Sequence, residues 1–193
     1  MKSIKPQMTA ISLVLSAAFS FPVLANTTVI HAGELLVEAG NKPLKKQSII
    51  VKDGKIVEVK KGFINAKTVA SDANVVDLSD AFVLPGLMDM HVHLQGELGP
   101  RNDSDALRLS DADKLVKSAM YAERTLMAGF TTVRDLGGLP EQSFALRDGI
   151  AKGWIAGPRI MAAGSNVAVT GGHGDVDVMK PDLLHIHTAK TVC

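Results

Sequence analysis

The sequence predicts an α/β protein in two parts, a small β module followed by alternating strands and helices. Short β-branched runs separated by turn residues dominate residues 26–84, as expected for strands joined by tight turns. From residue 85 the pattern becomes strand, helix, strand, helix, strand, which is typical of a parallel α/β sheet or barrel. With 193 residues, 46% of them hydrophobic, the chain can bury a sizeable core.

Residues 1–25 are predicted to be a signal peptide. Lys2 and Lys5 precede an apolar run over residues 10–24, and the small or apolar residues before position 26 favour cleavage after Ala25. The alternative is a membrane anchor that stays uncleaved, but serines and a proline interrupt the run, which is shorter than the roughly 20 apolar residues that span a bilayer. We therefore expect a periplasmic or secreted protein with no stable membrane anchor.

Charge and cysteine content exclude several classes of protein. Removal of residues 1–25 leaves 19 basic and 20 acidic side chains, with no basic stripe, and one Trp and one Tyr offer little stacking surface. We expect no nucleic-acid partner. Cys193 is the only cysteine, so no disulfide can form within the chain.

The β module is predicted to be antiparallel. Its expected strands cover residues 29–37, 48–52, 55–59, 75–78 and 82–84. Asp53 and Gly54 separate two of these runs by two residues, which favours a type I′ hairpin.

The second part begins with a buried strand over residues 87–94. Asp111 or Asp113 is expected to cap the first helix, which Gly129 ends. Its predicted apolar face consists of Leu115, Val116, Ala119, Met120, Leu126 and Met127. A second strand over 130–133 follows, then a helix from Pro140 to about residue 152, then a third strand over 158–162.

His91 and His93 are the candidate metal ligands. Side chains at positions i and i+2 of a strand leave the same face, so a strand here brings two imidazoles together. At the carboxyl end of the first strand of a parallel barrel, the pair lies where such enzymes keep their active sites. The alternative is that they are two polar residues at a strand end.

Five segments, taken in order, resemble the amidohydrolase superfamily, most closely its Xaa-Pro dipeptidase or imidazolonepropionase-like branch. They are Val-Val-Asp-Leu at 75–78 with Pro-Gly-Leu at 85–87, Asp-Met-His-Val-His-Leu at 89–94, Gly-Phe-Thr-Thr-Val-Arg-Asp at 129–135, Gly-Pro-Arg-Ile at 157–160 and Gly-Gly-His-Gly-Asp at 171–175. The resemblance covers roughly residues 28–178.

The resemblance implies a TIM-like (β/α)8 barrel flanked by a small β-sandwich. Residues 26–84 would belong to the sandwich, and residues 85–178 would form about three strand-helix units before the barrel is truncated. It also implies hydrolysis of C–N bonds in a small molecule or dipeptide, with one or two divalent metals, usually zinc. His91 and His93 match the first two metal ligands. Asp89 matches the acid that precedes them, which is expected to support the histidines or to pack the strand rather than to bind metal.

Other polar residues also have expected roles or positions. His173 matches a residue that contacts substrate, although its glycine neighbours also suit a simple turn. Arg134 and Asp135 are expected to form a buried ion pair, with substrate contact as the alternative. His31 is expected on the surface of the β module.

Residues 179–193 are expected to diverge from the family. The resemblance implies further ligands, a lysine on the fourth strand, histidines on the fifth and sixth and an aspartate on the eighth, for which we expect no counterpart in these 193 residues. His185 and His187 repeat the His-x-His spacing and would complete a four-histidine site only if this tail folded back. The alternative function is a non-catalytic truncated product, or a module that binds or complements another chain. Substrate, metal number and oligomeric state stay open, as do deaminase and lactonase chemistries.

We expect the chain by itself to be poorly stable, because three barrel strands would leave two open sheet edges and an apolar inner face. Thermal unfolding with sedimentation analysis of the mature chain tests this expectation. A monomeric, cooperative transition would contradict it.

Overall fold

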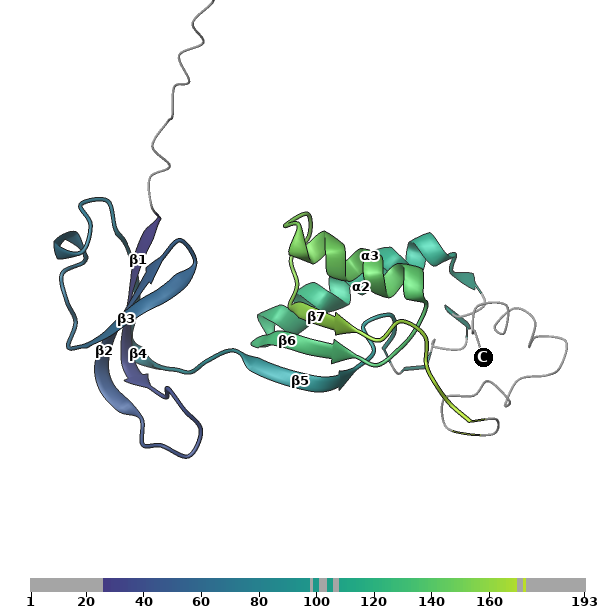
Figure 1. The fold of residues 1–193 in the computed structure, drawn as a ribbon, viewed down its shortest axis with the longest axis horizontal. Helices are drawn as coiled ribbons and strands as arrows, with labels where there is room; N and C mark the ends of the chain where they lie inside the picture. Colours follow the sequence, from purple (N-terminus) through teal and green to yellow (C-terminus); the bar gives the residue numbers. More distant parts are fainter. Residues whose placement is uncertain (1–25, 98, 101–103, 106–107, 170–171, 173–193) are drawn as a thin grey trace, which may run out of the picture. The chain divides into compact units, whose positions relative to one another are not determined.

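A computed structural model of the chain describes residues 26–97, 99–100, 104–105, 108–169 and 172. The predicted signal peptide over residues 1–25, His173 and the tail over 179–193 lie outside the described residues. The chain divides between Leu84 and Pro85 into an N-terminal and a C-terminal unit (Figure 1). None of the helices in the described ranges is long and apolar enough to cross a membrane.

The N-terminal unit contains a four-stranded sheet of order β3-β2-β1-β4. Its elements are β1 (Thr27–Leu35), β2 (Leu44–Lys52), β3 (Lys55–Lys61), the short 3-10 helix η1 (Ala66–Thr68) and β4 (Asn74–Val83). Asp53 and Gly54 both have positive φ angles, 49° and 74°, between β2 and β3. The predicted hairpin is confirmed, since a type I′ turn requires this conformation at both central residues.

The prediction of a purely antiparallel module was wrong, because β4 pairs with β1 in parallel. The two short strands predicted at 75–78 and 82–84 are one strand interrupted by a bulge. Ala32 pairs with Leu78 and Glu34 with Phe82, so three residues of β4 lie opposite Gly33. A Cβ on Gly33 would overlap the Ser79 carbonyl, and only glycine lets the backbones approach this closely.

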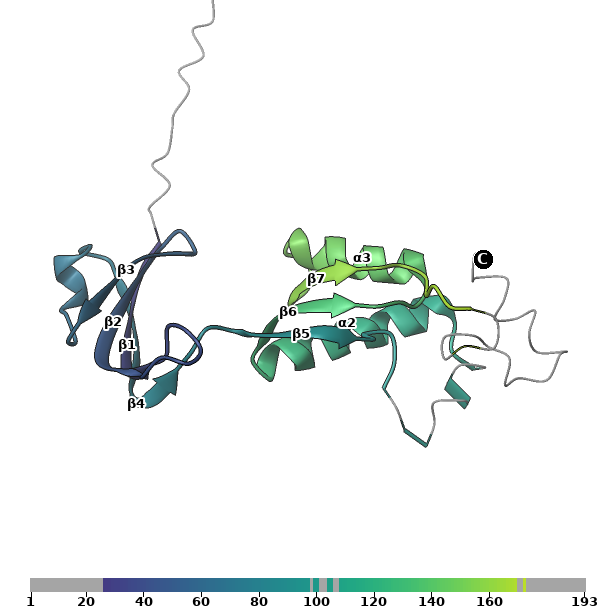
Figure 2. The same cartoon turned by 60° about the horizontal axis from the view of Figure 1, so that its bottom comes forward.

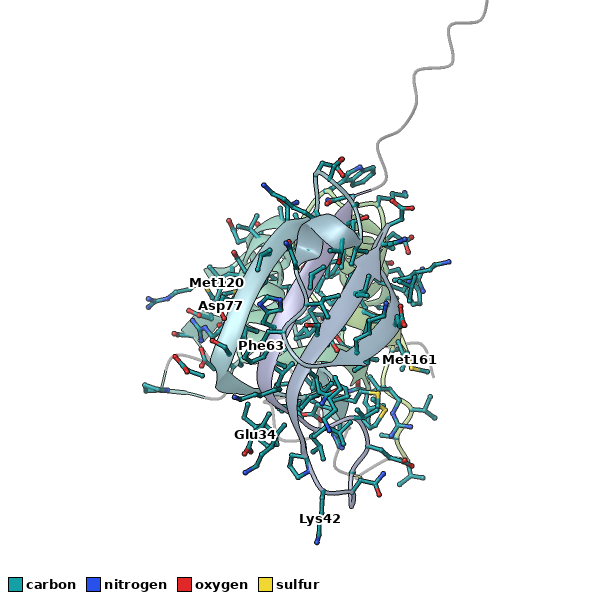
Figure 3. All side chains as sticks on the ribbon, turned by 90° about the vertical axis from the view of Figure 1, so that its left-hand side faces the viewer. Glu34, Lys42, Phe63, Asp77, Met120 and Met161 are labelled. Carbon is teal, nitrogen blue, oxygen red and sulfur yellow. The ribbon has the colours of Figure 1, made fainter. Side chains whose placement is uncertain are left out.

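His31 is half-buried and hydrogen-bonded, contrary to the surface position predicted for it. Its Nε2 donates to the Ile64 carbonyl at 3.0 Å, and its ring stacks on Phe63, labelled in Figure 3, with centroids 5.2 Å apart. Ser48 holds the same segment, donating to the Gly62 carbonyl at 2.8 Å and accepting from the Ile64 N–H at 3.1 Å. These contacts fix the segment after β3 against the sheet.

The C-terminal unit has a parallel sheet of order β5-β6-β7, with both helices on one face (Figures 1 and 2). Its elements are β5 (Leu87–Val92), α2 (Asp111–Met127), β6 (Phe130–Asp135), α3 (Pro140–Ala151) and β7 (Arg159–Ala162). The buried core between sheet and helices consists of Leu94, Ala122, Val133, Leu146 and Ile160. The predicted alternation of strands and helices is confirmed. The first strand is shorter than the predicted 87–94 and is not buried as predicted, since Leu87 and Met88 are 45% and 69% exposed.

Helix α2 begins with Ser110 as its N-cap, not with Asp111 or Asp113 as predicted. The Ser110 side chain accepts from the Asp113 N–H, while the Asp113 carboxylate accepts from the Ser110 N–H at 3.0 Å. This reciprocal pair is a capping box. Asp113 therefore contributes to the cap from the third position of the helix.

The buried face of α2 agrees with the prediction only in part. Leu115 and Ala119 pack against the core as predicted. Val116 and Met127 are 72% and 80% exposed, whereas Ser118 and Ala122 are buried. The Ser118 hydroxyl donates to the Lys114 carbonyl at 2.8 Å, so burial leaves no donor unpaired. Small side chains on this face allow the helix to lie close to the sheet, which a pattern of large apolar residues does not indicate.

We predict that the capping box stabilises the fold most above the ordinary carboxyl pKa. Hydrogen bonds from the Ser110 hydroxyl and the Ser110 backbone N–H lower the pKa of Asp113. A lowered folded-state pKa adds stability that is present above the unfolded value and is lost as pH falls through the folded value. The free energy of unfolding, measured by denaturant titration at about pH 6 and about pH 2, should fall less in Asp113→Asn than in the wild type. Ser110→Ala should reduce the pH dependence similarly; an unchanged dependence in both variants would contradict this assignment.

Candidate metal centre

A one-residue slip in the β5–β6 ladder determines where the two histidines point. Asp89 pairs with Val133 and Val92 pairs with Asp135. Between these two pairs β5 advances by three residues while β6 advances by two. Paired residues share a face of the sheet, and Val133 is fully buried under the helices. Asp89 and Val92 therefore face the helices, and His91 leaves on the opposite, open face. Bulges next to active sites commonly redirect a side chain in this way.

His91 and His93 lie side by side at the carboxyl end of β5, and both are exposed. Their ring centroids are 5.5 Å apart and the ring planes meet at 70°. The alternation resumes after the slip, because Val92 and Leu94 both pack into the core. The prediction that the two rings share one face agrees with this contact.

His93 is fixed by a hydrogen bond of its Nδ1 to the Gly137 carbonyl at 2.9 Å. A carbonyl oxygen only accepts, so Nδ1 carries the proton and Nε2 keeps its lone pair. Histidines that bind metals usually hold the other ring nitrogen against a carbonyl or carboxylate in this manner. His93 is therefore prepared to bind a cation through Nε2.

Asp89 contacts the main chain of the ligand strand. Its carboxylate accepts from the His91 N–H at 2.9 Å, across the slip in the ladder. Its predicted support of the histidines stays a prediction, and the structure gives it a backbone contact rather than a contact with either ring.

The predicted ion pair between Arg134 and Asp135 is wrong. Consecutive residues of a strand leave opposite faces, so the two side chains cannot meet. Arg134 is exposed and its Nε donates to the Met90 carbonyl at 2.8 Å. Asp135 is 1% exposed and accepts from the N–H groups of Gly137 and Leu94. Burial raises the pKa of Asp135, opposed by those two hydrogen bonds and by the nearby His93.

Gln95 is a residue of the site region that the sequence analysis did not identify. Its Oε1 accepts from the Leu139 N–H at 2.6 Å, while its Nε2 donates to the Leu139 carbonyl at 3.0 Å and to the Ser143 hydroxyl at 2.5 Å. The amide ties the loop after β5 to the first turn of α3. The signal in the sequence is Gly138, where a Cβ would overlap the Gln95 side chain.

The histidine pair fits half of a metal site. In the part of the chain that the structure describes, no three His, Cys, Asp or Glu side chains gather to hold a metal ion. The predicted substrate contact His173, and the alternative ligands His185 and His187, lie outside the described residues. Two imidazoles, one fixed in the tautomer that suits a cation, are what the described residues bring together.

Comparison with known proteins identifies relatives of this arrangement. The model of the amidohydrolase family matches residues 82–191, a range that includes most of the tail predicted to diverge from the family. Ochratoxinase from Aspergillus niger is 28% identical over 160 residues, covering 79% of this chain and 31% of the relative. The chain thus spans about a third of the length of this curated relative.

Solved structures give the same result. A Xaa-Pro dipeptidase with methionine bound in its active site is 36% identical, with a TM-score of 0.71 over 81% of this chain and 38% of that one. A prolidase complexed with N-methylphosphonate-L-proline is 26% identical, with a TM-score of 0.67 over 86% of this chain and 40% of that one. The predicted α/β fold and the predicted superfamily are confirmed over the part of the relatives that this chain covers.

We predict that Gly137→Ala destabilises the turn that holds His93. Gly137 has a φ of 141°, and an added Cβ would overlap the Asn166 side chain. Strain and overlap together should lower the free energy of unfolding by more than about 1 kcal/mol. The matched control is Gly129→Ala, at a φ of 95° with nothing within 4 Å of the added Cβ. Denaturant unfolding should show the larger loss for Gly137→Ala; equal losses would contradict the packing argument.

Proposed function

We propose that this chain, which belongs to the amidohydrolase family, supplies the first two metal ligands of a hydrolase that cleaves C–N bonds in small amide substrates. The observation that carries the proposal is the bond from His93 Nδ1 to the Gly137 carbonyl. It leaves Nε2 of His93 free on the face that also carries His91. His31 also donates to a backbone carbonyl, but what sets His93 apart is a second imidazole beside it, with ring centroids 5.5 Å apart.

Zinc is the cation that we propose for the pair. Neutral imidazoles suit zinc, and a catalytic zinc site commonly has three protein ligands and one open position. When bound, such a cation lowers the pKa of its water to about 7 and polarises the scissile carbonyl. His91 and His93 would hold it, and at least one further ligand must join them. The buried Asp135 and the Gly137 turn keep the ring of His93 in place for that purpose.

A dipeptide is the substrate class that we propose. Its support is the 36% identity to the Xaa-Pro dipeptidase over 81% of this chain. The prolidase structure contains a phosphonate analogue of a proline dipeptide, which is consistent with this class. The match to ochratoxinase, 28% identical over 160 residues, supports a small-molecule substrate more generally.

Export is proposed from the sequence of residues 1–25. Lys2 and Lys5 followed by an apolar run and the small residue Ala25 support a cleaved signal peptide and a periplasmic or secreted protein.

A second candidate function is complementation by another polypeptide. The open face of the C-terminal sheet exposes Met88 and Met161, which are 69% and 55% exposed. Among the described residues, β5 and β7 are the outer strands of this sheet. Outer strands with free backbone groups can pair with another chain. A partner of this kind would supply the further ligands, and the histidine pair would keep its role.

The metal test compares three histidine variants of the full chain. His91→Ala and His93→Ala each remove a proposed ligand, whereas His31→Ala removes a hydrogen-bonded histidine in the other unit. Co²⁺ titration followed by absorption, with elemental analysis for zinc, should show affinity reduced at least about tenfold in the first two variants. His31→Ala should bind as the wild type does.

Hydrolysis of Xaa-Pro dipeptides by the zinc-loaded chain would support the enzymatic proposal directly. Metal binding without hydrolysis would favour the complementation alternative, and recovery of hydrolysis on mixing with a partner would establish it. Equal metal affinity in all three variants and the wild type would contradict the assignment of His91 and His93.

A further inference from the structure

We infer that Asp135 is the positioning residue of His93, because its carboxylate fixes the turn whose carbonyl sets the tautomer of that ring. The inference deepens the proposed function and rests on it, since it concerns how one proposed metal ligand is oriented. Asp135 touches neither imidazole through any described hydrogen bond. Asp135 would orient the His93 ring through the backbone segments on both sides of the bond from His93 Nδ1 to the Gly137 carbonyl.

The carboxylate binds two backbone N–H groups that flank the His93 contact. Asp135 Oδ1 accepts from the Gly137 N–H at 3.2 Å, and Oδ2 accepts from the Leu94 N–H at 3.4 Å. Gly137 supplies the carbonyl that receives the His93 proton, and Leu94 is the residue directly after His93. One buried group therefore ties together the donor and the acceptor segments of this bond.

The site of Asp135 is rigid. The side chain is 1% exposed at the end of β6, and its backbone carbonyl accepts from the Ala163 N–H at 2.9 Å, after β7. The next residue, Leu136, donates its N–H to the Val92 carbonyl at 3.1 Å. The carboxylate thus stands on a strand end that is bonded to both neighbouring strands.

A carboxylate suits this position because both of its partners are donors. An ionised Asp has two accepting oxygens and no donor. Asparagine offers one accepting oxygen and an NH2 group, which would face an N–H at one of the two contacts. Alanine offers neither, and would leave the Gly137 turn and the Leu94 amide without this link.

The experiment measures the tautomer of His93 in the metal-free full chain. Long-range ¹H–¹⁵N spectra, recorded at a pH at which the imidazole rings are neutral, distinguish the Nδ1–H from the Nε2–H form. The wild type should show His93 as Nδ1–H. Asp135→Ala should shift His93 towards the Nε2–H form and weaken Co²⁺ binding by about tenfold to a hundredfold. Asp135→Asn should lie between the two.

The matched control is Asp113→Ala, which removes another carboxylate that accepts backbone N–H groups, in the cap of α2. It should lower stability without changing the His93 tautomer, so a merely structural role of Asp135 would be recognised. If Asp135→Ala does not fold, a lower Nδ1–H population in Asp135→Asn than in the wild type still supports the inference.

Two results would overturn the inference: an Nε2–H form of His93 in the wild type, or an unchanged tautomer in every folded Asp135 variant. The proposed function fails separately. A wild-type chain that shows the Nδ1–H form, loses it in the Asp135 variants and binds no Co²⁺ would support the orienting role of Asp135 and contradict the metal site. If the chain binds Co²⁺ and the tautomer of His93 is the same in the wild type and the Asp135 variants, the metal site would be supported and the orienting role of Asp135 contradicted.

Discussion

The one-residue slip between β5 and β6 is the constraint on which the candidate site depends. Regular alternation from Asp89 would send His91 towards the helices, into the side of the sheet that holds the core. The extra residue in β5 reverses the alternation, so that Val92 and Leu94 complete the core while the histidines reach the open face. A local irregularity of the backbone thereby allows one strand to serve both packing and chemistry.

Beyond the slip, backbone contacts at the strand ends set the position of His93. The loops after β5 and β6 are joined by the Asp135 carboxylate and, farther on, by the Gln95 amide. Both groups bond main-chain atoms, and these bonds hold the turn that carries the Gly137 carbonyl. The ring of His93 receives its orientation from this framework, since its Nδ1 meets a carbonyl of the same turn.

The order of strands and helices, and the proximity of His91 to His93, could be predicted from the sequence because both depend on local periodicity and turn residues. The sequence could not predict which face carries the histidines, since Asp89-Met90-His91 has no residue that demands a bulge. The parallel pairing of β4 was missed because strand direction depends on how distant segments meet, which local periodicity does not record. The face of α2 was predicted in part: Leu115 and Ala119 pack against the core as expected, whereas the small buried residues Ser118 and Ala122 were not identified.

Preorganisation matters more for a two-ligand half-site than for a complete one. Ordering an imidazole when the metal binds costs conformational entropy, which reduces the binding free energy gained from the metal bond. A site with two ligands has fewer metal bonds to offset this cost than a complete site has. His93 has its ring held before any cation arrives, whereas His91 is held through its backbone by Asp89. If the pair holds a cation as proposed, His93 would be the firmer ligand, and the ring of His91 would adjust to the geometry that a third ligand imposes. This asymmetry suits a site whose remaining ligands come from elsewhere in the fold.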